Sequence, residues 1–238
     1  MSLNKTAFAI SARIGSKRIK KKNIKNFNGK PIILYPLETA MESGLFDEII
    51  VSSDDFGTLA IADKNNSITS HRRAIPEHQN LSEALTKIIS GNSLVEKGFS
   101  KIVLSLATAV FYTEFDLITA LNKHVEGTNT ICVVPYSHPI ERAMHLKFKP
   151  KEGSYLYMNP EMKSRDTQSF ATNYHDAGQF YIVDIKHFMS CKKIISNKSR
   201  PYFINPEYVV DIDNPSDWKR AEWSYKAFTA ELDSLSAS

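Results

Sequence analysis

Residues 6–31 read TAFAISARIGSKRIKKKNIKNFNGKP, an apolar run followed at once by a basic segment. Short continuous apolar runs are typical of buried strands in parallel sheets, so the run predicts a first strand over 6–11. The segment 11–31 holds eight Lys or Arg residues and no acid. Gly15 would let backbone amides approach an anion, and the cations would add charge-assisted donors. The pattern predicts a phosphate-binding loop after the strand, with a solvated basic loop as the alternative.

Positive charge is concentrated in this part of the chain. The 238 residues include 30 Lys plus Arg and 26 Asp plus Glu, yet the first acid is Glu38. From there onward the acids outnumber the bases. A protein that binds nucleic acids or membranes in general would distribute its charge differently. We therefore expect neither nucleic acid nor a membrane as a partner.

The length and composition suit a single domain, 1–238, with one sizeable core, because 42% of the residues are hydrophobic. The sequence shows no apolar run near the roughly 20 residues that a membrane span needs, and no apolar core of a secretory signal. The isolated Cys132 and Cys191 fit a reducing compartment. These features predict a cytoplasmic protein.

Strand-like and helix-like segments alternate along most of the chain. This alternation predicts an α/β Rossmann-like fold of three layers, with a mostly parallel sheet covered on both faces. The segment 138–175 breaks the pattern and is interpreted as an inserted dimerisation arm. Further strands are expected over 48–53, 101–107, 129–135, 178–184 and 208–213. Helices are expected over 31–44, 54–64, 81–90 and 113–127, with glycine closing the first and the last, and from Asn214 onward.

Acidic side chains lie within one expected strand, 208–213, and directly after another, 48–53. In open parallel sheets, ligands bind beyond the carboxyl ends of the strands, where the basic loop also begins. Asp211 and Asp213, two apart on an expected strand, would face one side and offer oxygen ligands to Mg²⁺. An ordinary exposed strand face is the alternative. Asp54 is interpreted as the cap of the next helix, with ligand contact as the alternative, and Asp217 as a first-turn acid of the last helix.

Four segments in order resemble one enzyme family. The stretch ARIGSKRIKKKNIKNFNGKPI is similar to the signature ARxGSKRxxxKNxxxxxGKPL of cytidylyltransferases that activate nonulosonic acids. GLFDEIIVSSDD (44–55), YHDAGQFY (174–181) and YVVDIDNPSDWKRAE (208–222) follow in the order of that family. HDAGQFY most resembles the pseudaminic acid branch and points away from enzymes that activate 3-deoxy-octulosonate.

The resemblance implies transfer of CMP from CTP to a pseudaminic, legionaminic or N-acylneuraminic type of acid. Pyrophosphate would be released, Mg²⁺ required, and the enzyme commonly a homodimer that exchanges an arm. Its product would serve glycosylation of flagellin or surface polysaccharide. The implied catalytic residues are Arg13, Lys17 and Lys22, which would hold the triphosphate. Nucleotide binding would also involve Gly15, Ser16, Asn23, Arg72 and Ser82. Sugar binding would use Thr108, Arg165, Gln168, His175, Asp176, Gln179 and Tyr181. The metal would be held by Asp211 and Asp213.

Several of these residues have an alternative interpretation. Arg73 could replace Arg72, or both could form a solvated turn, and His175 and Tyr181 could have structural roles. The segment LATAVF, 106–111, stands where the family usually has PTAPF or PTSPL, and Ile14 replaces a glycine. Proline stiffens a loop, so its loss could move the backbone beside the substrate. A non-catalytic nucleotide-binding or partner protein is therefore the rival hypothesis.

Overall fold

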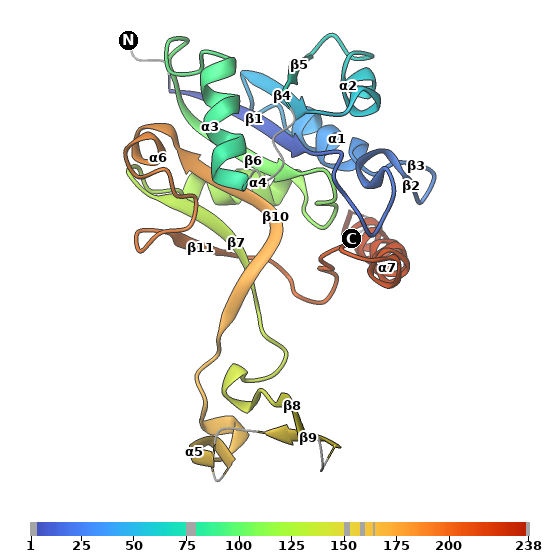
Figure 1. The fold of residues 1–238 in the computed structure, drawn as a ribbon. Helices are drawn as coiled ribbons and strands as arrows, with labels where there is room; N and C mark the ends of the chain where they lie inside the picture. The colour runs from blue at the N-terminus through green and yellow to red at the C-terminus, as the bar shows by residue number, and fades with distance from the viewer. Residues whose placement is uncertain (1–3, 75–79, 150–152, 158–159, 164, 237–238) are drawn as a thin grey trace.

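The computed structural model describes residues 4–74, 80–149, 153–157, 160–163 and 165–236. Within them, a seven-stranded sheet has the order β11-β7-β10-β6-β1-β4-β5. All neighbours in it are parallel except β10, which runs antiparallel to β6 and β7. The predicted mostly parallel α/β fold is confirmed (Figure 1). The strands are β1 (Lys5–Ala12), β4 (Glu48–Ser53), β5 (Ile68–Arg72), β6 (Phe99–Leu106), β7 (Asn129–Pro135), β10 (Tyr174–Asp184) and β11 (Arg200–Phe203).

Four helices begin at a polar residue whose side chain accepts from the first turn, whereas the first helix begins after Ile33 without such a cap. Asp55, not Asp54, caps the second helix, since its carboxylate accepts from the Thr58 amide. Gly44, with φ 62°, closes the first helix as predicted. The helix predicted to end at glycine 127 ends earlier, at Lys123. The helices of the body are α1 (Leu34–Ser43), α2 (Phe56–Ala62), α3 (Leu81–Gly91), α4 (Glu114–Lys123), α6 (Ile185–Cys191) and α7 (Pro215–Ser236).

The strand period of two divides the core between the two faces of the sheet. Phe8 and Ile10 of β1 pack with apolar residues of α1, α2 and α4 on one face. Ala7 and Ala9, which alternate with them, pack with residues of α3 and α6 on the other. The molecule therefore has the three layers that the sequence predicted. No helix in the described ranges is both long and apolar enough to cross a membrane.

The strand predicted over 208–213 is absent from the sheet, and this expectation is corrected. The edge position beside β7 is occupied by β11 instead. Residues 208–213 nevertheless keep the alternation of an extended chain, with Val210 and Ile212 buried and Asp211 and Asp213 exposed. The two carboxylates therefore still project to one side, although no ladder partner fixes them.

A third hydrophobic cluster explains why the segment 208–213 lies where it does. Phe27 packs edge-on against Trp218 of α7, with ring centroids 5.5 Å apart. The cluster joins three stretches that are far apart in sequence: the end of the basic segment, the residues after β6, and the approach to α7. Its members include Ile19, Phe27, Ile32, Val110, Phe111, Val210, Ile212, Trp218 and Ala221. Burial of these apolar side chains holds the polar residues beside them within reach of one another.

The chain between β7 and β10 leaves the body as a long arm (Figure 1). Its base is a two-stranded ribbon in which Tyr174 pairs with Pro135. At its far end lie the hairpin β8 (His145–Lys149) and β9 (Gly153–Tyr157), the short helix α5 (Pro160–Lys163) and the turn η3 (Thr167–Ser169). Its role in joining two copies stays a prediction.

Candidate active site

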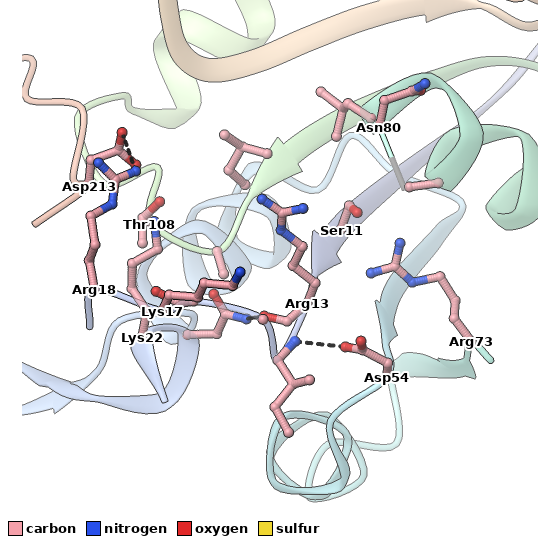
Figure 2. Close-up of a pocket in the computed structure, with 18 of the residues that line it drawn as sticks. Ser11, Arg13, Lys17, Arg18, Lys22, Asp54, Arg73, Asn80, Thr108 and Asp213 are labelled. Atoms are coloured by element: carbon pink, nitrogen blue, oxygen red, sulfur yellow. Dashed lines mark hydrogen bonds and ion pairs between the residues drawn. The ribbon is translucent and has the colours of Figure 1, made fainter. Parts of the chain in front are cut away.

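A cleft of about 800 Å³ opens beyond the carboxyl ends of β1, β4 and β6 (Figure 2). The basic loop forms one wall, and residues after β6, the start of α3 and the approach to α7 form the others. Ligands of open α/β sheets bind at this edge. The predicted site residues that line the cleft are Arg13, Gly15, Ser16, Lys17, Lys22, Asn23, Thr108 and Asp213.

Internal hydrogen bonds hold the basic loop in shape. The Ile14 amide donates to Asp54 Oδ1 at 2.8 Å, so Asp54 braces the loop. Asn23 Nδ2 donates to the Arg13 carbonyl at 3.0 Å, while Asn23 lines the cleft. With the backbone held in this way, the side chains of Arg13 and Lys17 extend into the same part of the cleft (Figure 2). The loop therefore presents fixed cations to a ligand.

The segment 208–213, which precedes α7, faces this loop across the cleft. Lys22 Nζ donates to the Ile212 carbonyl at 2.7 Å. Arg18 forms an ion pair with Asp213 at 3.0 Å, with both side chains at least half exposed. An exposed pair of this kind contributes only about 0–1 kcal/mol to folding. Its importance is therefore geometric, since it shows that cations of the loop and the Asp213 carboxylate lie at one cleft.

The pKa of Lys22 is lowered and that of Asp211 is raised, so burial disfavours the charged form of both groups. Burial lowers the pKa of the Lys22 ammonium, and the charges of Asp213 and Asp211 partly reverse this. Burial, followed by the like charge of Asp213, raises the pKa of the Asp211 carboxyl. Two carboxylates that repel each other are a favourable place for a cation.

The pair Asp211 and Asp213 fits Mg²⁺ only if a ligand completes the site. No group of three or more His, Cys, Asp or Glu side chains suited to a metal occurs among the described residues. Mg²⁺ is usually bound through one or two carboxylates plus substrate phosphates, and it retains several waters. The donor set therefore suits a metal that is shared with a nucleotide rather than one held by protein alone.

A second cleft of about 460 Å³ adjoins the first, with Asn80 and Leu81 lining both. The predicted sugar residues Asp176 and Tyr181 line it, and the Tyr181 hydroxyl donates to Asp176 Oδ2 at 2.6 Å. Burial raises the pKa of Tyr181, so its hydroxyl stays a donor at neutral pH. The remaining lining residues are Ser82, Lys192, Lys193, Ile194 and Ile195.

Ser82 thus lies in this second cleft and not in the cleft with the cationic loop, where it was expected. Lys192 and Lys193 were missed by the sequence reasoning. Two adjacent lysines after a short helix look like any solvated turn, so the sequence held no signal for them.

The two adjacent arginines have opposite surroundings. The Arg72 guanidinium lies over the Phe56 ring, 4.2 Å from its centroid, outside the cleft. Arg73 is buried, lines the cleft and donates to the Ala12 carbonyl at 2.9 Å. Neighbouring side chains of an extended chain point to opposite sides, so only one of the two could reach the cleft. The structure thus places Arg73, and not Arg72, in the lining of the cleft.

Gln179 and His175 line neither of the two clefts described above. Gln179 is 1% exposed, and its amide is bonded to the Phe111 amide and the Ala177 carbonyl. His175 lies at the base of the arm, where its ring packs on Tyr136 with centroids 4.7 Å apart. In this structure both side chains are engaged by neighbouring groups of the protein.

Arg165 and Gln168 lie on the arm. The Arg165 guanidinium covers the Phe170 ring at 4.6 Å, and Gln168 belongs to the turn η3. The arm projects away from the body (Figure 1), and neither residue lines either of the two clefts described above.

The segment LATAVF is anchored although it lacks proline. The Ala109 amide donates to the Leu106 carbonyl at 3.1 Å, which closes a turn. Val110 and Phe111 are buried in the third hydrophobic cluster. Thr108, which precedes both in the chain, lines the cleft (Figure 2). The loss of proline rigidity is therefore offset by burial and hydrogen bonds.

The cations at the end of β1, with the Asp213 carboxylate opposite them, suit an anion that carries several charges. An attacked phosphate gains charge on its oxygens, and preorganised cations stabilise that charge. The fold and this cleft together define a nucleotidyltransferase.

Comparison with known proteins identifies the family of nucleotidyltransferases to which the chain belongs. A family described as cytidylyltransferase matches residues 7–97. The chain is 31% identical over 224 residues to the pseudaminic acid cytidylyltransferase of Campylobacter jejuni serotype O:23/36, covering 91% of this chain and 94% of the relative. It is 25% identical over 224 residues to the CMP-N,N'-diacetyllegionaminic acid synthase of Legionella pneumophila, covering 90% and 93%. The chain belongs to the CMP-nonulosonic acid synthetase family of cytidylyltransferases.

Solved structures agree on the fold. CMP:2-keto-3-deoxy-manno-octonic acid synthetase complexed with CTP has a TM-score of 0.66 at 13% identity, covering 96% of this chain and 99% of that chain. A 4-diphosphocytidyl-2C-methyl-D-erythritol synthase has a TM-score of 0.63 at 11% identity, covering 93% and 99%. At these identities, the likeness supports the architecture alone.

Proposed function

We propose that this chain transfers CMP from CTP to a nine-carbon acidic sugar of the pseudaminic acid type and releases pyrophosphate. One observation carries the proposal: the cationic loop and the Asp211–Asp213 segment meet across one cleft, through Lys22 and Ile212 and through Arg18 and Asp213. The similarity to pseudaminic acid cytidylyltransferases over most of the chain supports the choice of substrates.

The basic loop would hold the triphosphate. In the reaction, the sugar hydroxyl oxygen forms a bond to the α-phosphorus, the bond from that phosphorus to the bridging oxygen breaks, and the hydroxyl loses its proton. Arg13, Lys17 and Lys22 would offset the charge that grows on the phosphate oxygens, which lowers the barrier. Asp211 and Asp213 would hold Mg²⁺ together with the triphosphate. When bound there, the metal supplies further positive charge beside the phosphates.

The second cleft is the proposed place for the sugar. It adjoins the nucleotide cleft through Asn80 and Leu81, so a sugar in it would lie beside the phosphates. Asp176 and Tyr181 offer polar contacts, and Ile194 and Ile195 offer an apolar wall for acyl groups. This combination suits a substrate with both hydroxyl and acylated amine groups.

The arm supports a homodimer. Leu146, Phe148 and Leu156 of its hairpin are 72%, 71% and 63% exposed, and Leu146 pairs directly with Leu156. Apolar side chains gathered at the end of a projecting arm favour burial against another surface. In a second copy of this chain, Arg165 and Gln168 would then reach the partner's cleft and could contact the sugar carboxylate and amides. Use of the product in glycosylation of flagellin or surface polysaccharide stays a prediction.

The test is release of pyrophosphate from CTP and Mg²⁺ with a panel of pseudaminic, legionaminic and N-acylneuraminic acids. We expect turnover with at least one of them, highest with the pseudaminic type, and a preference for CTP over other nucleoside triphosphates. Asp211→Asn should reduce turnover at least 100-fold, whereas Glu207→Gln, an exposed change in the same segment, should leave it within twofold. CTP binding without turnover by the unaltered protein would favour the non-catalytic rival. Full turnover by Asp211→Asn would refute the metal assignment.

A further inference from the structure

The antiparallel strand β10 is interrupted beside the two clefts. Its register against β7 breaks between Asp176 and Tyr181, and Gly178 within the break has φ 63°. This left-handed conformation favours glycine. Bulges next to active sites change the direction in which side chains point. Here the break leaves Asp176 exposed and turns Gln179 into the interior.

The side-chain amide of Gln179 links two segments of the backbone through hydrogen bonds. Its Oε1 accepts from the Phe111 amide at 3.0 Å, and its Nε2 donates to the Ala177 carbonyl at 3.2 Å. Its own carbonyl accepts from Ser105 Oγ at 2.9 Å, and Ser105 Oγ accepts from the Tyr112 hydroxyl at 3.1 Å. These groups are buried, where a lost partner is costly and cooperative networks specify one arrangement.

The segment held in this way contains Thr108. It has two polar attachments on the backbone: the turn from Ala109 to Leu106, and the bond from Phe111 to Gln179. Thr108 lies before the second attachment and, like Lys17 and Asp213, lines the cleft (Figure 2). Without the Gln179 bond, only the turn and the burial of neighbouring apolar groups would fix the position of Thr108.

We propose that Gln179 is a positioning residue, which sets the place of Thr108 in the active-site cleft through the Phe111 amide. The proposal rests on the proposed function of the same cleft. Gln179 touches no substrate in this account. Its effect on the reaction arises because it fixes the backbone of residues 107–111 beside the position where the phosphates would bind.

The test compares Gln179→Met, which keeps the length of the side chain but removes both hydrogen bonds, with Val183→Ala. Val183 is buried in the same strand and packs in the cluster on the face with α3 and α6. It therefore serves as a control for general loss of stability. We expect kcat of Gln179→Met to fall at least tenfold, with the Kd for CTP within threefold of the unaltered protein. Val183→Ala should keep kcat within twofold at temperatures where it is folded.

Hydrogen–deuterium exchange gives a readout that does not depend on turnover. In Gln179→Met, exchange of the peptide that contains residues 107–112 should accelerate at least tenfold, while Val183→Ala should leave it protected. If Gln179→Met does not fold, Gln179→Asn keeps an amide in the interior but shortens its reach, and is measured in the same way.

Unchanged kcat and unchanged protection of 107–112 would overturn the proposal, as would equal losses in Val183→Ala. If the unaltered protein turned over no sugar, the proposed function would fail, and the exchange experiment would still decide whether Gln179 fixes the segment.

Discussion

Lys22 donates from Nζ to the carbonyl oxygen of Ile212 at 2.7 Å, across 190 residues of sequence. The acceptor lies between Asp211 and Asp213 in the chain, so this bond joins the basic loop to the segment that carries both carboxylates. The side chain of Ile212 and that of Ile19, from the same loop as Lys22, belong to one hydrophobic cluster. Apolar burial thus supports the geometry that the polar groups use.

Removal of the Lys22 ammonium should weaken nucleotide binding. Hydrogen bonds that involve a charged group contribute about 1.5–3 kcal/mol, so we expect Lys22→Ala to raise the Kd for CTP by roughly 10- to 100-fold. Isothermal titration calorimetry measures this change. Lys20→Ala is the matched control, because Lys20 is exposed and lines neither cleft. Equal Kd values for the two variants would contradict the role of Lys22.

The stability of the fold should depend on His124 at mildly acidic pH. Its Nδ1 lies 2.9 Å from Thr130 Oγ1, and burial, followed by the charge of Lys101, lowers its pKa. A lowered pKa in the folded state means that the stabilisation is complete above the ordinary value of about 6.5 and is lost as pH falls through the lowered value. Urea unfolding at pH 7.5, 6.5 and 5.5 should therefore show a decline that is smaller in His124→Gln. An identical decline in both proteins would exclude His124 as a cause.

An alanine at position 91 should destabilise the protein, although Gly→Ala within a helix usually stabilises it by about 0.5–1 kcal/mol. A Cβ there would overlap His71 Nε2, and His71 is held by a contact of 2.9 Å between its Nδ1 and Ser52 Oγ. Overpacking of this kind costs about 1–3 kcal/mol, measurable by urea unfolding of Gly91→Ala. Adding His71→Ala should remove most of the additional cost. A more stable Gly91→Ala variant would show that the imidazole moves aside freely.

The arm should determine the oligomeric state. Leu146→Glu places a charge among the exposed apolar side chains of the hairpin, and we expect it to convert a dimer into a monomer at micromolar concentration. Light scattering after size exclusion measures the mass. Trp223→Glu, at a residue of α7 that is 70% exposed, should leave the mass unchanged. A monomeric unaltered protein would refute the dimer, and a dimer that survives Leu146→Glu would move its interface elsewhere.

Much of the fold could be predicted because buried parallel strands and capped helices leave local patterns. Residues 48–53 and 129–135 form the strands that their apolar runs indicated. The segment 208–213 was misassigned for a physical reason: an alternating pattern reports one buried side, and here that side packs on α7 and the basic segment instead of pairing in the sheet. β11, RPYF, is short and contains Pro201, so it had no comparable signal.

The part of the candidate site where charge is concentrated could be predicted from the sequence. The direction of individual side chains could not, because the tertiary fold determines it. The basic loop could be read from composition, whereas spacing alone left the pair Asp211 and Asp213 open between a metal site and an exposed strand face. The choice of Arg73 over Arg72 depends on the direction in which each side chain leaves the strand end. Likewise, the inward turn of Gln179 depends on a break in strand register, which the sequence does not display.

The central claim is that one triphosphate lies between the basic loop and the segment that precedes α7. A crystal structure with CTP and Mn²⁺, in which anomalous scattering locates the metal, tests it most directly. The account predicts phosphate oxygens in contact with Arg13, Lys17 and Lys22, and the manganese peak at Asp211 and Asp213. A triphosphate bound away from the loop, or a metal peak remote from both carboxylates, would contradict it.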